Sequence, residues 1–250
     1  MDTPDERKAR AAKLNKRLKR AIVTPRCELR HQSPWQLLIA TILSAQSTDR
    51  TVNRVTPELF RRYPTPAALA AADMATLEQL VRPTGFFRNK AKAIVGASRL
   101  LVTQHGGEVP RTVAELTQLP GVARKTANVV LGTAYGISSG ITVDTHAGRV
   151  ARRLHLTHET NPVKVERDLC ALFSKRQWVD TGHRLVLHGR YVCQAKSARC
   201  NACPLAELCP ENEATPIGRW TQRADAENAL VDAATQDSLT PPRAAVGGRS

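Results

Sequence analysis

The stretch Leu-Pro-Gly-Val-Ala-Arg-Lys-Thr-Ala, at residues 119–127, decides the fold of this 250-residue chain. Helical patterns lie on both sides of it, over about 112–118 and 124–135, so it is predicted to be the turn between two helices. A Pro-Gly turn followed by a helix start directs backbone N–H groups outward at the positive end of the helix dipole. The stretch therefore predicts either an ordinary helix–helix turn or a hairpin that binds phosphate.

Further helical patterns extend in both directions from this turn. Ser33 and Pro34 begin a segment that is apolar almost all round, which is typical of a buried helix. No segment of useful length alternates between apolar and polar residues, so the predicted fold class is all-α. The other predicted helices cover about 5–22, 66–72, 73–82, 89–104, 144–155, 162–173 and 180–192.

The composition favours a polyanionic partner. The formal net charge is +15, and such an excess is typical of proteins that bind nucleic acid, although a solvated charged surface is the alternative. A hydrophobic content of 42% excludes a wholly disordered chain. No run of about 18 apolar residues is present, so no membrane span is expected. The acidic N-terminal residues lack an apolar stretch, which favours a cytoplasmic location in which thiols stay reduced.

Four cysteines near the end of the chain predict a metal centre. Cys193, Cys200, Cys203 and Cys209 have the spacing C-x6-C-x2-C-x5-C, and four thiols in so short a loop can surround one metal site. Zinc and an iron–sulfur cluster both accept four thiolates, so the residues alone leave the two open.

Two residues suggest chemistry on a sugar. Lys125 lies on the first turn of the helix that follows the Pro-Gly turn, where a lysine is a solvated side chain, a phosphate contact or a nucleophile. An amine can attack a sugar C1′ and form a Schiff base if it is partly neutral at pH 7. Asp144 is predicted to cap the helix that starts near residue 145, and a rigid capping carboxylate can also accept a proton.

Four motifs in this order resemble the endonuclease III family of DNA glycosylases, within the helix-hairpin-helix superfamily. They are Leu-Ser-Ala-Gln-Ser-Thr-Asp at 43–49, the hairpin at 119–127, Val-Asp-Thr-His at 143–146, and the four-cysteine loop. The resemblance covers roughly residues 30–210. It implies an enzyme that removes oxidised pyrimidines from duplex DNA and then cuts the strand 3′ to the abasic site by β-elimination.

The resemblance also implies roles for individual residues. By resemblance, Lys125 is the Schiff-base nucleophile and Asp144 is the residue that activates it. The four cysteines are the ligands of a 4Fe–4S cluster. Ala123 stands where the hairpin commonly has glycine, and Phe86 stands where the family often has an aliphatic wedge. The residues expected to contact DNA are Gln46, Phe86, Gly121, Ala123, Arg124, His146 and Lys196.

The family architecture has two helical domains. By resemblance, a six-helix barrel covers 34–137, with the helix-hairpin-helix at about 112–135. The iron–sulfur cluster domain combines 5–33 and 138–210. Lys125 and Asp144 are expected to face each other across the cleft between the domains. Residues 211–250 are expected to be disordered, because they are rich in Ala, Pro, Thr and Gly without helical periodicity. We expect a cytoplasmic, nucleoid-associated monomer.

Two alternative functions stay open. One is a monofunctional glycosylase of other specificity. Adenine-removing relatives carry a catalytic Glu on the helix equivalent to residues 34–46 and lack the nucleophilic lysine, whereas residues 36–46 here contain no carboxylate. The other is a non-catalytic helix-hairpin-helix module that only binds DNA.

Overall fold

The computed structural model describes residues 3–239, which are mostly helical and contain no β-strand. The predicted all-α fold class is confirmed. Contacts divide the chain into two compact units. The first unit consists of residues 3–27, Pro110–Gln118 and Val122–Ala233, and the second of Glu28–Val109, Leu119–Gly121 and 234–239. Within residues 3–239, no helix has both the length and the apolar character needed to cross a membrane.

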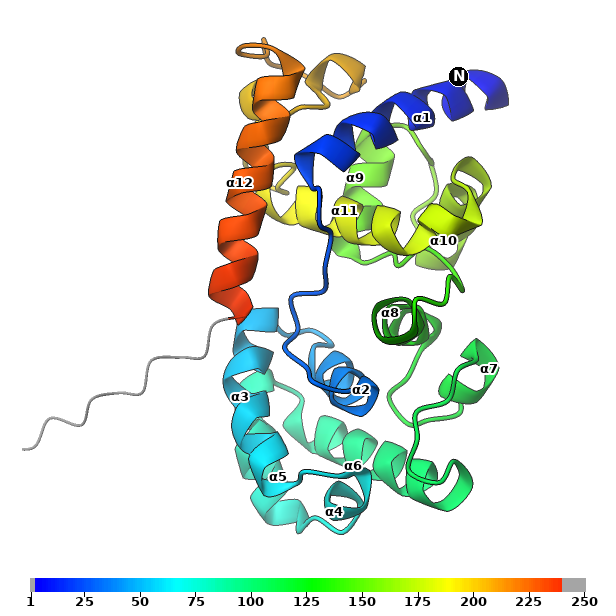
Figure 1. The fold of residues 1–250 in the computed structure, drawn as a ribbon, viewed down its shortest axis with the longest axis vertical. Coiled ribbons are helices and arrows are strands. Elements are labelled where there is room, and N and C mark those ends of the chain that lie inside the picture. The colour runs from blue at the N-terminus through cyan, green and yellow to red at the C-terminus, as the bar shows by residue number, and fades with distance from the viewer. Residues whose placement is uncertain (1–2, 240–250) are drawn as a thin grey trace, which may run out of the picture. The chain divides into compact units, whose positions relative to one another are not determined.

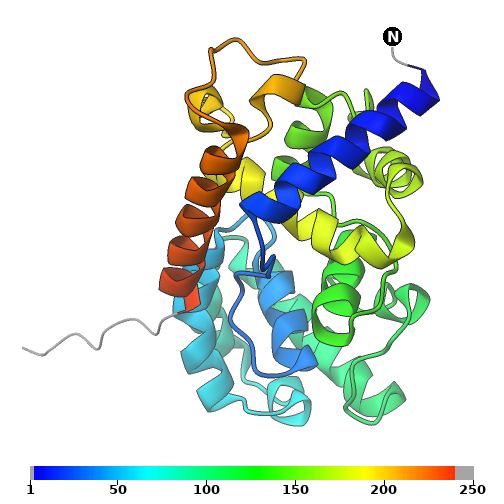
Figure 2. The ribbon, with the colours of Figure 1, turned by 45° about the horizontal axis from the view of Figure 1, so that its top comes forward.

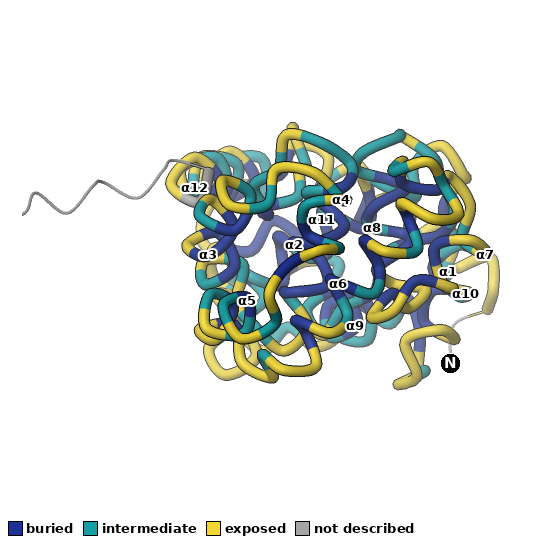
Figure 3. The backbone as a smooth tube through the Cα atoms, turned by 90° about the horizontal axis from the view of Figure 1, so that it is seen from below, coloured by how far each residue is buried: buried dark blue, intermediate teal, exposed yellow. Residues whose placement is uncertain are grey.

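The second unit is built around a buried helix. In α2 (Pro34–Leu43), residues 37–43 are all buried, which confirms the expectation drawn from its apolar sequence (Figure 3). The helix α6 packs against α4 and α5, and α2 contacts α3 and α6. The other elements of this unit are α3 (Asp49–Arg62), α4 (Pro66–Ala70), α5 (Met74–Val81), the 3-10 turn η1 (Arg82–Thr84) and α6 (Phe87–Gln104).

The first unit packs α9 (Thr145–Arg153) closely against α11 (Trp178–Tyr191), and α1 (Pro4–Ala21) also contacts α11 (Figures 1 and 2). Gly189 makes the approach of α9 to α11 possible, because a Cβ there would lie 3.0 Å from the Cβ and carbonyl oxygen of His146. The remaining elements are α7 (Val113–Leu116), α8 (Arg124–Tyr135), α10 (Pro162–Leu172), η2 (Lys175–Gln177), η3 (Cys200–Ala202), η4 (Ala206–Leu208) and α12 (Trp220–Leu239).

Side-chain caps begin several helices, among them those predicted at Ser33 and Asp144. The side chains of Ser33, Thr65, Asp73 and Asp144 each accept a hydrogen bond from the backbone N–H three residues later. Each cap satisfies one of the N–H groups that have no partner within the helix, and this is why these helices begin where they do.

The helix α3 was not predicted from the sequence. It is mostly polar and contains Pro57, which disfavours a helix interior. Thr48 caps it through the N–H of Thr51, and its apolar face buries Val52, Val55 and Leu59. Packing of that face therefore outweighs the proline.

The helix α12 corrects the expectation that residues 211–250 are disordered. Residues 220–239 are helical, and residues 240–250 lie outside the described part of the chain. Asp225 forms a two-pronged ion pair with Arg20 of α1, at 2.9 Å for each bond. The side-chain oxygen of Asn228 accepts the N–H of Val23 at 2.9 Å. The sequence of this segment lacks a strong apolar stripe, so its helix depends on these contacts with distant residues.

The division into units differs from the predicted boundary at residue 137. The helix α8 contacts α7 and α11 and belongs to the first unit. Lys125 and Asp144 consequently lie in one compact unit, whereas the predicted boundary separates them.

Candidate active site

The first turn of α8 presents free backbone donors. Ala123 is its N-cap residue and offers no side-chain cap, and the first bond within the helix runs from the N–H of Ala127 to the carbonyl of Ala123. The N–H groups of residues 124–126 therefore have no partner inside the helix. Residues 123–125 are exposed, so a phosphate oxygen can reach these donors.

The turn before α8 explains why alanine is tolerated at residue 123. Ala123 has φ −90° and ψ 170°, which is extended backbone open to any residue. The left-handed position of the turn is Gly121, with φ 77°. A Cβ on Gly121 would also lie 2.9 Å from the Cβ of Ala93. The departure from glycine at Ala123 therefore introduces no backbone strain.

Lys125 and Asp144 occupy the N-terminal ends of two helices in the first unit. Lys125 is exposed on the first turn of α8. Asp144 is the N-cap of α9, and its Oδ1 accepts the N–H of Ala147 at 2.8 Å. Its second carboxylate oxygen takes no part in this cap. One carboxylate can thus hold the helix start with one oxygen and offer the other to a proton.

A polar network fixes the segment between α8 and α9. Glu166 of α10 accepts hydrogen bonds from Arg124, with Nη2 2.9 Å from Oε1, and from Nδ2 of Asn128 at 3.0 Å. Ser139 donates its hydroxyl to Oδ1 of Asn128 at 2.8 Å. Gly140 leaves room for the network, because a Cβ there would overlap the carboxylate of Glu166. The network positions the chain four residues before Asp144.

Sequence reasoning missed this network. Glu166, Asn128 and Ser139 are separated by 11 to 38 residues and belong to no motif. Arg124, which was predicted to contact DNA, forms an ion pair with Glu166, whose side chain is 10% exposed, while the side chain of Arg124 itself is 48% exposed. The sequence offers one signal for such a network. An acidic residue such as Glu166, on the face of a helix that is predicted to be buried, requires a polar partner inside the protein.

His146 and Arg149 link α9 to the start of the cysteine loop. Arg149 donates from Nη2 to the carbonyl of Gly189 at 2.7 Å and from Nε to the carbonyl of Cys193 at 3.1 Å. His146 is half-buried, with Nδ1 3.4 Å from Nη2 of the same arginine. The helix capped by Asp144 is therefore tied to the cysteine loop.

The four cysteines line a single cavity of about 430 Å³. All four are free thiols, and Lys196, predicted to contact DNA, is exposed at the rim of this cavity. Arg153 braces the loop through the carbonyl of Gln194 at 2.8 Å and lies 3.4 Å from the sulfur of Cys193. Burial raises the pKa of the Cys209 thiol to about 11 and also raises that of Cys200.

The chemistry of these thiols fits two kinds of metal site. Within residues 3–239, no group of three His, Cys, Asp or Glu side chains is placed to hold a metal ion. Four thiolates suit an iron–sulfur cluster as well as zinc. All four cysteines line one cavity, which fits either group, and the family resemblance favours the cluster.

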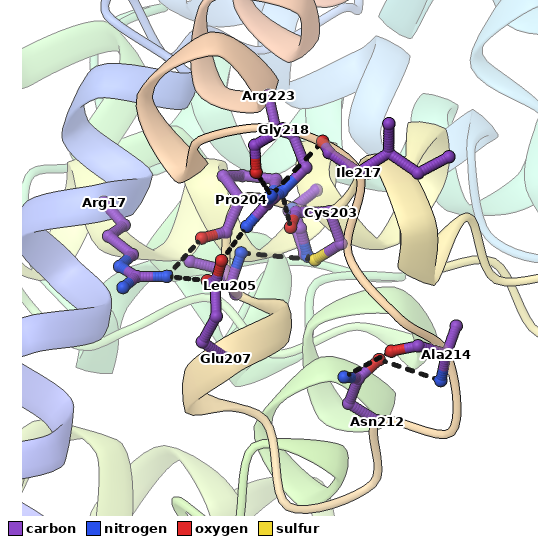
Figure 4. Close-up of polar contacts among 11 residues, drawn as sticks. Arg17, Cys203, Pro204, Leu205, Glu207, Asn212, Ala214, Ile217, Gly218 and Arg223 are labelled. Atoms are coloured by element: carbon purple, nitrogen blue, oxygen red, sulfur yellow. Dashed lines mark hydrogen bonds and ion pairs between the residues drawn. The ribbon is translucent and has the colours of Figure 1, made fainter.

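Two helices hold the cysteine loop in place (Figure 4). Nε of Arg223, on α12, donates to the carbonyl of Cys203 at 2.8 Å. Arg17, on α1, donates to the carbonyl of Pro204 at 2.8 Å, and both arginines contact the carboxylate of Glu207. The loop that carries the four cysteines is therefore fixed by residues that are distant in the sequence.

Two predicted DNA contacts of the second unit have strained backbones. In the described chain, the non-glycine residues with positive φ are Gln46 (53°), Phe86 (47°) and His155 (50°). Such a conformation costs about 1–3 kcal/mol and is found most often at functional sites. Gln46 is exposed at the turn after α2, and Phe86, which precedes α6, is 64% exposed. Both residues are thus presented to solvent on turns with a left-handed backbone.

Comparisons with known proteins show the family to which this chain belongs. Residues 39–175 match the HhH-GPD superfamily of base excision DNA repair proteins. Endonuclease III of Synechocystis sp. is 51% identical over 84% of this chain and 95% of its own length. Two solved structures, a non-covalent endonuclease III–DNA complex and a trapped covalent endonuclease III–DNA intermediate, each give a TM-score of 0.80. Each is 42% identical and covers 85% of this chain and 98% of its own.

The helical fold, the hairpin and these matches define a DNA glycosylase of base excision repair. The chain belongs to the endonuclease III family, so it is a bifunctional DNA glycosylase and abasic-site lyase.

Proposed function

We propose that this enzyme removes oxidised pyrimidines from duplex DNA and cuts 3′ to the abasic site, with Lys125 as the Schiff-base nucleophile. The observation that supports the assignment is the placement of Lys125 and Asp144 at two helix N-termini of one compact unit. The Glu166 network fixes the segment that joins these helices.

In the proposed glycosylase step, the neutral amine of Lys125 attacks C1′ of a nucleotide that has left the base stack. The bond from C1′ to the base breaks and the base leaves with its electron pair. Asp144 takes a proton from the attacking nitrogen through the carboxylate oxygen that the cap leaves unused. The bond from C1′ to the ring oxygen then breaks, the ring oxygen takes the proton back from Asp144, and the lone pair of the Lys125 nitrogen forms a protonated imine with C1′ of the opened sugar.

In the proposed lyase step, the imine acidifies the hydrogens on C2′. Water takes one of them as a proton, its electron pair forms a double bond between C2′ and C3′, and the bond from C3′ to the 3′ phosphate breaks. This β-elimination cuts the strand. Water then hydrolyses the imine and releases Lys125. A damaged base that pairs weakly leaves the stack at a lower free-energy cost than an intact base, and this difference accounts for part of the selectivity.

We assign binding of the duplex to the hairpin and to the two turns that carry Gln46 and Phe86. The free N–H groups of residues 124–126 would receive a phosphate, and Gln46 and Phe86 would fill the gap left by the extruded nucleotide. Lys196, at the rim of the cysteine cavity, would meet a second phosphate.

We assign a 4Fe–4S cluster to Cys193, Cys200, Cys203 and Cys209, which line one cavity. When bound, the cluster supplies a structural centre and redox capacity, and the loop positions Lys196. We also propose that the enzyme acts on DNA as a nucleoid-associated, cytoplasmic monomer.

Substrate specificity is tested with duplexes that each contain one modified base. We expect release of thymine glycol and dihydrouracil, with a nick that appears at the same rate as base release or later. A duplex with 8-oxoguanine should be cut at least tenfold more slowly. Faster release of the purine, or base release without any nick, would contradict the proposed function.

A further inference from the structure

The turn before α6 has an unusual backbone at two consecutive residues. Gly85 has φ 71° and ψ 160°, a region that is open almost only to glycine, and Phe86 has φ 47° and ψ 30°, which is left-handed. A Cβ on Gly85 would meet no atom within 4 Å, so the backbone conformation, and not a lack of space, requires glycine here. A turn of this kind persists only where the surrounding structure holds it in place.

Lys90, on the first turn of α6, holds this turn on both sides of Gly85. Its side-chain Nζ donates to the carbonyl of Thr84 at 2.7 Å, and its backbone N–H donates to the carbonyl of Phe86 at 3.1 Å. The hydroxyl of Thr84 donates in turn to the carbonyl of Val81 at 2.8 Å, at the end of α5. One lysine therefore fixes the two carbonyl groups between which the chain makes its unusual bend.

The burial of Lys90 indicates that this contact is the reason for a lysine at this position. Lys90 is 5% exposed, and Thr84 is 2% exposed. Burial lowers the pKa of the Lys90 amine, which donates to the carbonyl with or without its extra proton. A lysine is almost never buried unless its amine has a partner, and an apolar side chain of similar length would fill the space without desolvating an amine. The hydrogen bond to the turn, and not packing of the core, thus explains the residue.

The two adjacent phenylalanines of this segment differ in their surroundings. Phe87 is half-buried, and its ring centroid lies 5.3 Å from Cζ of Arg88 and 5.9 Å from Cζ of Arg82. Phe86 is 64% exposed. Cation–π contacts therefore hold the ring of Phe87 on the outer side of the turn, while the ring of Phe86 is left free for a partner.

We propose that Lys90 sets the position of Phe86 and thereby controls the insertion of this ring into duplex DNA. Lys90 acts through Phe86 without touching the substrate, so it is a positioning residue for recognition of the lesion. The inference rests on the proposed function, in which Phe86 helps to fill the gap left by the extruded nucleotide. A side chain that is already held in its bound position loses less conformational freedom on binding, so a looser turn should weaken insertion.

The variant Lys90→Met tests the proposal. Methionine keeps an unbranched, apolar side chain but removes the amine, so the carbonyl of Thr84 loses its donor and the turn at Gly85 and Phe86 can relax. We would measure single-turnover base release from a duplex that contains one thymine glycol. The release rate should fall about tenfold, which lies within the range expected for loss of the stacking ring itself.

Cleavage of a single-stranded oligonucleotide with one abasic site separates positioning from general damage to the fold. This substrate has no duplex gap for Phe86 to fill, yet it is cut through the same proposed imine at Lys125. Lys90→Met should therefore cut it at the wild-type rate. Equal losses on the duplex and on the single strand would overturn the proposal. The matched control is Lys92→Met, an exposed lysine of the same helix, which should leave both rates unchanged.

A double variant tests whether Lys90 acts through Phe86. Residues that act as one unit have non-additive effects, so Phe86→Ala with Lys90→Met should release the base from the duplex no more slowly than Phe86→Ala alone. Losses that multiply in the double variant would show an independent role for Lys90 and overturn the proposal.

The single variants separate this inference from the one on which it rests. Phe86→Ala protein that acts on the duplex at the wild-type rate would contradict the proposed role of Phe86 and the role of Lys90 with it. A loss in Phe86→Ala without a loss in Lys90→Met would contradict the role of Lys90 alone.

If Lys90→Met does not fold, Gly85→Ala decides. Alanine disfavours the backbone of this turn but introduces no clash, so base release from the duplex should fall while single-strand cleavage stays at the wild-type rate. Unchanged release from the duplex by folded Gly85→Ala protein would show that the turn does not set the position of Phe86, and would overturn the proposal.

Discussion

Arg124 and Glu166 form a two-pronged ion pair that joins the start of α8 to α10. Nη2 of Arg124 lies 2.9 Å from Oε1 of Glu166, and Nε lies 3.1 Å from both carboxylate oxygens. The pair holds this guanidinium against α10, and the backbone N–H groups of the first turn are left for an incoming phosphate. The residue next in sequence, Lys125, is thereby held on a turn whose position is fixed by a neighbouring helix.

Gly140→Ala should disrupt this arrangement. The new Cβ would overlap the carboxylate of Glu166 and lie 2.7 Å from Nδ2 of Asn128, so the buried side of the network must move. Overpacking of this kind costs about 1–3 kcal/mol of unfolding free energy. Denaturation by urea measures the loss.

Gly148→Ala in α9 is the control for that substitution. A Cβ there meets atoms no closer than 3.4 Å, at the flexible end of Arg152, and alanine favours a helix interior. We expect unchanged or slightly higher stability. Equal losses in the two variants would argue against a special role for Gly140.

Asp144→Asn separates the capping role of this residue from its chemical role. Asparagine caps a helix about as well as aspartate, so unfolding should change by less than about 1 kcal/mol. The loss of the carboxylate should lower single-turnover base release about 10²- to 10⁴-fold, the usual contribution of a general base. A folded variant with near wild-type turnover would restrict Asp144 to the cap.

Phe86→Ala should impair recognition of the lesion without affecting the fold. The side chain is exposed, so its removal should change stability by less than about 0.5 kcal/mol. If the ring stacks between bases, its loss should lower kcat/KM on duplex substrate by about 1–3 kcal/mol, which is roughly 5- to 150-fold. Val102→Ala, also exposed and also in the second unit, should have no effect.

The buried His183 should make the folded protein less stable in mild acid. Burial lowers the pKa of this histidine to about 4, and its Nε2 lies 3.2 Å from the hydroxyl of Thr133 on α8. The unfolded chain gains a proton on this histidine near pH 6.5, and the folded chain gains it only near pH 4. The free energy of unfolding is therefore unaffected above pH 6.5 and decreases as the pH is lowered from 6.5 to 4. The loss over this range is about 3 kcal/mol. His183→Asn should flatten the dependence of Tm on pH between 6.5 and 4; an unchanged slope would contradict the assignment.

Local signals predicted much of the fold and the candidate site. The apolar run of α2 and the caps at Ser33 and Asp144 depend on neighbouring residues, so they were visible in the sequence. The cysteine spacing was visible for the same reason. The pairing of Arg124 with Glu166 was not, because it joins residues 42 apart on two helices. Likewise, α12 depends on its contacts with α1, and the left-handed backbone at Gln46 and Phe86 has no sequence pattern of its own.

The most direct test of the proposed chemistry is borohydride trapping with wild-type protein, Lys125→Ala and Lys164→Ala. Lys164 is a matched control, because it is an exposed lysine of the same unit. Each protein is mixed with a duplex that contains one abasic site, and borohydride then reduces any imine to a stable bond. The proposed mechanism predicts a covalent protein–DNA adduct for wild type and Lys164→Ala, and none for Lys125→Ala. An adduct that survives in folded Lys125→Ala protein would place the nucleophile on another amine and contradict the mechanism.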